Sequence, residues 1–295
     1  MSNLDECRLC PGECGVNRNK GERGFCGAGS KIRVGRIDLH YWEEPCISGE
    51  RGSGAVFFSG CTMRCDYCQN RELSRDGKGF EIGEDELAER LLELESKGAA
   101  NINLVTPSHY APLIVKVLDK ARARGLSLPI VYNCGGYEKV ETLKGLEGYV
   151  DIYLPDLKYR SNIYGVKYSR AADYFNTAAA AIAEMFRQTG PCKFGEDGMM
   201  KRGVIIRHLL LPGLLFEAKK IVDYVHETYG DSVWLSLMNQ YTVMPEVSCP
   251  ELCRSVPKGH YEALVNYCAE LGMEKVYIQG GDAAASDYIP EFYGE

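Results

Sequence analysis

Residues 60–70 read Gly60-Cys61-Thr62-Met63-Arg64-Cys65-Asp66-Tyr67-Cys68-Gln69-Asn70 and follow the apolar run Ala55-Val56-Phe57-Phe58. This stretch places three cysteines at a C-x3-C-x2-C spacing, so three thiolates on one short loop can converge on a single metal centre. A structural zinc site is closed by four protein ligands, and the loop offers no fourth. The spacing therefore favours an iron–sulfur cluster with one iron left open for a ligand. Half of a zinc site, or three cysteines without any metal, are the alternatives.

The chain around this loop alternates apolar strand segments with amphipathic helical segments. Helical spacing is clear at Ile114, Val117, Leu118 and Ala121, which follow the i, i+3, i+4, i+7 pattern. Alternation of this kind predicts a parallel sheet or barrel, which keeps its chemistry in the loops at the carboxyl ends of the strands. We predict an α/β fold, a partial (β/α)6 TIM-like barrel of six or seven βα units. Strands are expected at 55–59, 101–106, 129–133, 150–154, 203–210, 233–238 and 275–278, with helices near 84–97 and 171–188.

A second group of cysteines lies near the N-terminus. Cys7, Cys10 and Cys14 have a C-x2-C-x3-C spacing, and Cys26 follows within a glycine-containing stretch. Glycines permit the tight turns that bring four ligands together, and four thiolates suit either zinc or an iron centre. The segment is therefore expected to bind metal, as a structural staple, an electron relay or an auxiliary cluster, and the spacing does not choose among them.

Length and composition limit the other possibilities. A chain of 295 residues has room for one large α/β domain and a small appendage. We divide it into a cysteine-rich segment and connector at 1–50, the barrel at 51–282 and a C-terminal tail at 283–295. A net charge of −7 argues against nucleic acid as a partner, since general nucleic-acid binders present a basic surface. With no signal-peptide layout, no long apolar run and 13 clustered cysteines that suit a reducing compartment, we expect a cytoplasmic protein without membrane contact.

Polar side chains follow several of the expected strands. Because the carboxyl ends of parallel strands meet at one mouth of a barrel, these side chains are expected to converge on a charged ligand. For any one of them, a polar group satisfied by its neighbours is an equally good interpretation. The residues are Thr106 and His109 after the second strand, Asn133 on the third, Asp156 and Lys158 after the fourth, and Arg207 on the fifth.

The loop at 60–70 resembles the motif of the radical S-adenosylmethionine (SAM) enzymes. The resemblance implies that Cys61, Cys65 and Cys68 hold a [4Fe-4S] cluster whose open iron is chelated by SAM. It also implies that reductive cleavage of SAM yields a 5′-deoxyadenosyl radical, which takes a hydrogen atom from the substrate. Tyr67 stands where the family usually has an aromatic residue near the adenine. Arg207 is then a partner for the SAM carboxylate, and Asp156 for its cationic groups or ribose.

Within that superfamily the chain is most similar to homologues of the pyruvate formate-lyase activating enzymes. In those enzymes an Asp-Leu-Lys element and an arginine on the fifth strand lie at the SAM site, which implies the same for Asp156, Lys158 and Arg207. Asn133 stands where the family has a polar residue near the ribose. The similarity is carried by residues 7–11, 22–26, 42–45, 60–70, 132–136, 154–159 and 207–213.

Two departures from the activating enzymes bear on the substrate. The usual Gly-Gly-Glu, which meets the SAM amino group, is Val105-Thr106-Pro107 here, so Thr106 or His109 is the expected substitute. The four-cysteine region replaces the segment that normally precedes the barrel in true glycyl-radical activases. Both changes leave SAM chemistry expected and weaken the inference that the substrate is a glycine of pyruvate formate-lyase.

The leading hypothesis is a radical SAM oxidoreductase that activates a glycyl radical enzyme. It would need a low-potential electron donor such as flavodoxin or ferredoxin. A radical SAM enzyme that modifies another peptide or a small metabolite is the first alternative. A zinc-binding, non-catalytic scaffold with a degenerate barrel is the second.

Overall fold

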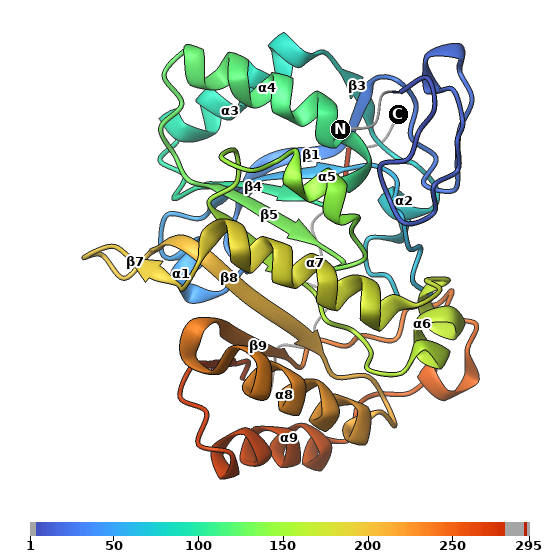
Figure 1. Cartoon of the computed structure of the whole chain (residues 1–295), viewed down its shortest axis with the longest axis vertical. Coiled ribbons are helices and arrows are strands. Elements are labelled where there is room, and N and C mark those ends of the chain that lie inside the picture. The colour runs from blue at the N-terminus through green and yellow to red at the C-terminus, as the bar shows by residue number, and fades with distance from the viewer. Residues whose placement is uncertain (1–3, 281–291, 294–295) are drawn as a thin grey trace.

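The apolar runs expected as strands lie side by side in one sheet (Figure 1). The computed structural model describes residues 4–280 and 292–293, and the fold is a mixed α/β one with a mainly parallel sheet, as predicted. Every residue of β2, β4 and β6 is buried, as is typical of parallel strands covered on both faces. The parallel strands, in spatial order, are β2 (Ser53–Phe58), β4 (Ile102–Val105), β5 (Ile130–Cys134), β6 (Ile152–Pro155), β8 (Met200–Leu209), β9 (Trp234–Met238) and β10 (Val276–Ile278).

Amphipathic helices connect these strands and lie around the outside of the sheet (Figure 1). In α4 the predicted stripe is buried, including Ile114, Val117, Leu118 and Ala121. None of the helices that the structure describes is both long enough and apolar enough to span a membrane. The longer helices are α3 (Glu84–Ser96), α4 (Ala111–Ala123), α7 (Tyr174–Thr189), α8 (Leu215–Tyr229) and α9 (Lys258–Glu270); the shorter ones are α1 (Pro45–Ser48), α2 (Arg71–Ser74), α5 (Val140–Lys144) and α6 (Asn162–Ser169).

Residues expected to be a connector extend the sheet instead. β1 (Ile32–His40) pairs antiparallel with β2, and β3 (Phe80–Ile82) pairs antiparallel with β1 at the edge. The sequence indicates only a short strand here because few of its side chains are strictly apolar, whereas pairing with β2 satisfies the whole backbone. A two-residue strand, β7 (Lys193–Phe194), pairs with β8. The division at residue 50 stays a prediction, and the expected tail at 283–295 lies outside the described residues apart from 292–293.

The N-terminal coil lies beside the carboxyl ends of the strands, shown in dark blue in Figure 1. Arg18, which is 1% exposed, joins it to the barrel. Its Nη1 donates to the carbonyl oxygen of His109 at 2.6 Å, and its Nε donates to the carbonyl oxygen of Gly29 at 2.7 Å. His109 belongs to a short 3-10 helix, Ser108–Tyr110, that follows β4. The cysteine-rich segment is therefore fixed at the end of the sheet where barrel enzymes keep their sites.

Candidate functional site

The three-cysteine loop leaves the carboxyl end of β2 through a tight approach of two backbones. Gly60 has φ +90°, and a Cβ there would lie 2.5 Å from the carbonyl oxygen of Cys26. Only glycine fits such a position without displacing the neighbouring chain. Arg64 also has a positive φ, +58°, so the loop curls between Cys61 and Cys65.

Each of the three thiols on this loop accepts one hydrogen bond from the protein. Such donors stabilise negative charge on sulfur, and iron–sulfur clusters are tuned by hydrogen bonds of this kind. The bonds run from Met63 N to Cys61 Sγ at 3.4 Å, from Ser169 Oγ to Cys65 Sγ at 3.0 Å and from Ser74 Oγ to Cys68 Sγ at 3.4 Å.

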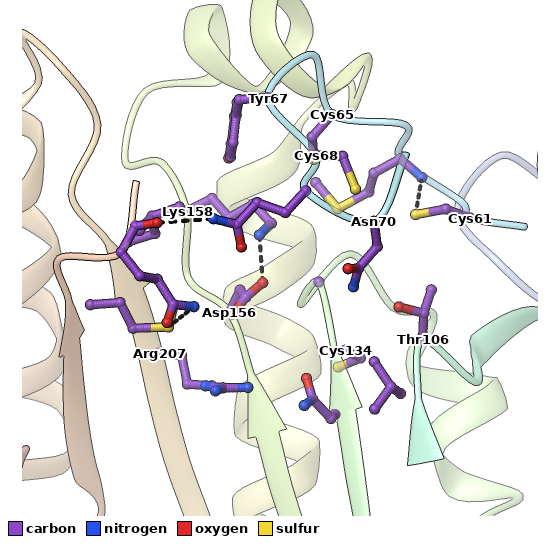
Figure 2. A pocket seen from close by; sticks show the side chains of 18 of the residues that line it. Cys61, Cys65, Tyr67, Cys68, Asn70, Thr106, Cys134, Asp156, Lys158 and Arg207 are labelled. Carbon is purple, nitrogen blue, oxygen red and sulfur yellow. Dashed lines mark hydrogen bonds and ion pairs between the residues drawn. The ribbon is translucent and has the colours of Figure 1, made fainter. Parts of the chain in front are cut away.

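The three cysteines line one cavity of about 250 Å³ above the strand ends (Figure 2). In Figure 2 they lie on the loop, facing Asp156, Cys134 and Thr106 across the cavity. The structure brings together all but one of the residues predicted to bind cofactor. Those that line the cavity are Tyr67, Thr106, Asn133, Asp156, Lys158 and Arg207. His109 lines a neighbouring cavity with the N-terminal cysteines instead, because the turn after β4 points it back toward that segment.

The donor set fits an iron–sulfur cluster. Three soft sulfur atoms with their own hydrogen-bond donors line a single cavity. A fourth cysteine, Cys134 at the end of β5, also lines the cavity but does not belong to the loop. Burial raises the pKa of the Cys61 thiol to about 12, and binding to a cationic metal would favour its thiolate form. Within the described residues, no three Cys, His, Asp or Glu side chains form a ready-made site for a single metal ion.

A charged pair lies directly beside the thiols. Lys158 and Asp156 form an ion pair after β6, and the dashed line in Figure 2 marks it. Burial raises the pKa of the Cys65 thiol, and the ammonium of Lys158 acts in the opposite direction. The Asp-Leu-Lys element therefore puts one carboxylate and one ammonium at the wall of the cavity, where both can meet a zwitterionic ligand.

Arg207, expected to pair with a ligand carboxylate, is paired with two glutamates of the chain. Its Nη2 donates to Glu43 Oε2 at 2.7 Å, and its Nε lies 3.0 Å from Glu44 Oε1. The three side chains are nearly buried, with 11%, 6% and 4% of their surface exposed. Asn133 also donates to Glu43, at 3.2 Å. The two glutamates precede α1, far away in sequence, so only the folded chain reveals that the guanidinium is already paired.

Tyr67 is held by a chain of hydroxyl groups that ends at a cluster thiol. Its hydroxyl lies 2.8 Å from that of Tyr159, which lies 2.7 Å from Ser169 Oγ, the donor to Cys65. Tyr67 is 5% exposed and lines the cavity. The aromatic residue that precedes the third cysteine thus has a fixed ring, as a side chain that packs against a bound ligand requires.

Glu138 is a cavity residue that sequence reasoning missed. It lies four residues past the end of β5, is 3% exposed, and accepts hydrogen bonds from Ser108 Oγ at 2.5 Å and Tyr132 OH at 3.2 Å. Burial raises the pKa of its carboxyl group to about 7, and hydrogen bonds from Ser108, Tyr132 and Cys134 oppose the rise. Within the described chain, no cation forms an ion pair with it. No motif in the sequence marks this position.

Glu138→Gln is expected to flatten the pH dependence of stability. The pKa of Glu138 is about 7 in the folded chain, above the ordinary value of 4.5, so its contribution to wild-type stability is fully present below pH 4.5. As the pH rises through about 7, the free energy of unfolding falls by roughly 3 kcal/mol in total because this contribution is lost. Urea unfolding of both proteins between pH 4.5 and 8.5 measures the difference. The exposed Glu141→Gln is the matched control, and parallel wild-type and Glu138→Gln profiles would contradict the assignment.

Comparison with known proteins adds a family match. A family model described as the Radical SAM superfamily matches residues 55–224, more than half of the chain, from β2 into α8. An uncharacterised protein of Methanocaldococcus jannaschii is 26% identical over 282 residues, covering 92% of this chain and 76% of the relative. The matched range contains the three-cysteine loop, which includes Tyr67, and all five predicted cavity residues that follow the loop, from Thr106 to Arg207.

One solved structure shares the fold at low identity, and a second is less similar. The AdoMet-bound structure of anSMEcpe has a TM-score of 0.51 and 14% identity, covering 75% of this chain and 61% of that one. SuiB of Streptococcus suis, bound to its precursor peptide SuiA, has a TM-score of 0.49 and 11% identity, covering 76% of this chain and 47% of SuiB. This chain spans about half to three fifths of the length of these two structures.

Proposed function

Because the chain belongs to the radical SAM superfamily and its chemistry is SAM cleavage at a [4Fe-4S] cluster, we propose that it abstracts hydrogen from a glycyl residue of a partner enzyme. The observation that carries the site is the set of three thiols, each with a hydrogen-bond donor, in one cavity with Asp156 and Lys158. When bound, the cluster supplies an electron and SAM supplies the 5′-deoxyadenosyl group that takes the hydrogen.

The protein's own residues then have separate tasks. Cys61, Cys65 and Cys68 bind the cluster, and Cys65 is the buried member of the three. Asp156 and Lys158 are proposed to meet the ammonium and carboxylate of SAM by opening their mutual ion pair.

The remaining predicted residues are proposed to position the nucleoside. Tyr67 offers a fixed aromatic face to the adenine, and Asn133 and Thr106 offer polar groups at the ends of β5 and β4 for the ribose. Arg207 acts through Glu43, whose carboxylate it holds beside Asn133.

The glycyl substrate is supported by the resemblance of the Asp156-Leu157-Lys158 element and its neighbours to the activating enzymes. A low-potential flavodoxin or ferredoxin would be the electron donor. The second candidate is modification of another peptide or a small metabolite, and Glu138 favours it. A glycyl radical forms by loss of a hydrogen atom alone, whereas a buried carboxylate without a cation suits a substrate that also loses a proton.

The test of SAM chemistry starts from anaerobically reconstituted protein. We expect 5′-deoxyadenosine when SAM and dithionite are added. A glycyl radical enzyme encoded beside this protein, labelled with deuterated glycine, should transfer deuterium into that product. Deuterium transfer from a different peptide or metabolite would favour the second candidate. Bound zinc without sulfide, and no 5′-deoxyadenosine, would contradict both and favour a zinc-binding scaffold.

Ser169→Ala is expected to lower the reduction potential of the cluster. Its hydroxyl donates to Cys65 Sγ at 3.0 Å, and such a donor stabilises the more negative reduced state. A difference of about 1 kcal/mol between the two oxidation states corresponds to roughly 40 mV for one electron. Redox titration followed by electron paramagnetic resonance (EPR) measures the shift. Ser53 is buried at the other end of β2, away from the loop, so Ser53→Ala should leave the reduction potential of the cluster unchanged.

A further inference from the structure

A second cavity, of about 280 Å³, is formed largely by the N-terminal coil. All four cysteines predicted there line it, although they are spread over twenty residues of sequence: Cys7, Cys10, Cys14 and Cys26. They are free thiols. The fold therefore brings four soft donors to the wall of one cavity, in a segment with no strand or α-helix of its own. Within the described chain, no three of them form a ready-made site for a single metal ion, but four thiols around one cavity suit a shared ligand.

This cavity directly adjoins the three-cysteine loop. Thr62, the residue after Cys61, lines both cavities. The carbonyl oxygen of Cys26 lies against Gly60, the residue before Cys61. On the other side of the loop, the guanidinium of Arg64 stacks on the ring of Phe25, 4.8 Å from its centroid. Cys26 of the second group thus packs against the residue that precedes Cys61 of the first group.

Two arginine side chains lie close to this cavity or line it. Arg18 is 1% exposed, and its guanidinium donates hydrogen bonds to the backbone carbonyls of Gly29 and His109. Among the described residues no carboxylate pairs with it. Arg18 is not among the residues that line this cavity, and its guanidinium lies 5.5 Å from the centroid of the Tyr110 ring. Arg170 does line the cavity, and a metal held by four thiolates would place negative charge beside this cation.

A buried nitrogen without a partner faces the same region. His109, 1% exposed, lines the cavity, and its Nε2 donates to the carbonyl oxygen of Ser59 at 2.8 Å. Its Nδ1 is buried and has no hydrogen-bond partner among the described residues. An imidazole whose other nitrogen donates to a backbone carbonyl has the tautomer found at metal sites. His109 therefore lines the cavity and carries one buried nitrogen that has no hydrogen-bond partner among the described residues.

We propose that Cys7, Cys10, Cys14 and Cys26 hold a second iron–sulfur cluster that relays single electrons to the cluster on the 61–68 loop. The proposal rests on the proposed function, because a relay needs a redox acceptor beside it. One electron from a low-potential protein donor reduces the second cluster and then passes to the first, with no bond made or broken. Cys14 is exposed whereas Cys65 is buried, so the second site is the one that a donor protein can approach.

The decisive experiment separates the two sites by mutation and measures metal, not turnover. A first-site variant, Cys61→Ser/Cys65→Ser/Cys68→Ser, and a second-site variant, Cys7→Ser/Cys10→Ser, are reconstituted anaerobically with iron and sulfide. We expect about eight iron and eight sulfide per wild-type chain and about four of each in either variant. Iron with sulfide in the first-site variant supports the proposal. Zinc without sulfide, or no metal there, overturns it even when the second-site variant still cleaves SAM.

Failure of the proposed function has a different signature. In that case the second-site variant binds no iron, whatever the first-site variant contains. Because the double substitution removes the buried Cys7 and can unfold the coil, the single variant Cys14→Ser at the exposed position provides a second, independent version of the same test. Circular dichroism and the thermal midpoint show whether each variant is folded.

The relay itself is tested by EPR and by reduction kinetics. Two reduced clusters in contact should broaden each other's signals in the wild type, and each variant should show one unbroadened signal. Reduced flavodoxin, as the probe, should reduce the first cluster of Cys14→Ser at least tenfold more slowly than that of the wild type. Unbroadened wild-type signals, or equal reduction rates, would show that the second centre does not relay electrons.

Discussion

Replacement of Cys65 by alanine is expected to reduce 5′-deoxyadenosine formation at least about a thousandfold, equivalent to about 4 kcal/mol in the barrier. Cys65 is 8% exposed, lines the cavity and accepts the hydroxyl hydrogen of Ser169. Its loss leaves two cysteines on the loop, too few to hold a cluster that needs three protein thiolates and an open iron. The measurement is single-turnover 5′-deoxyadenosine with dithionite, alongside iron and sulfide content.

The control for this substitution is Cys268→Ala. Cys268 is likewise buried, at 3% exposure, but lies on α9 outside the cavity. Its removal makes a similar small void and should leave 5′-deoxyadenosine formation within about a factor of two of the wild type. Wild-type SAM cleavage by Cys65→Ala would show that the cluster is held elsewhere.

Arg207→Met is expected to destabilise the folded chain by about 3–5 kcal/mol. Its guanidinium is the cation that the structure places between Glu43 and Glu44, whose side chains are 6% and 4% exposed. Removal of the cation leaves two carboxylates close together in a nearly dry site, where the neutral amides of Asn103 and Asn133 still donate to Glu43 but do not offset the charges. Urea unfolding of the cluster-free protein measures the loss without a contribution from bound iron.

A compensating variant separates this role from ligand binding. Glu43→Gln/Glu44→Gln/Arg207→Met removes all three charges and should recover most of the lost stability, since replacing a whole buried ion cluster is often close to neutral. If Arg207 instead pairs with the carboxylate of SAM, Arg207→Met will unfold at nearly the wild-type urea concentration and will bind SAM much more weakly. Isothermal titration of the reconstituted protein with SAM measures that second quantity.

The local pattern of apolar residues in the sequence was sufficient to predict the core of the fold. The buried strands β2, β4, β5 and β6 begin and end within three residues of the predicted ranges, because fully buried parallel strands are continuous apolar runs. The helices α3 and α4 match because their buried residues recur at helical spacing. β1 was underestimated, since a strand at the edge is defined by the partner it pairs with more than by its own side chains.

Sequence alone predicted the metal chemistry and where on the chain to expect it. Three cysteines within eight residues can reach one cluster whatever the rest of the chain does, since a short loop limits their separation. It also determined that the strand-end residues Thr106, Asn133, Asp156 and Lys158 meet at one mouth, because parallel strands share their carboxyl edge.

Tertiary structure alone decided which of these groups are free and which are paired. Glu43 reaches Arg207 across 164 positions, Glu138 enters the cavity from beyond β5, and His109 turns toward the N-terminal cysteines. Ion pairs and buried polar contacts between distant segments have no local signature. They form only when the packing of the whole sheet has excluded water from both partners, so the charge balance of the site and the contact between its two cysteine groups could be read only from the folded chain.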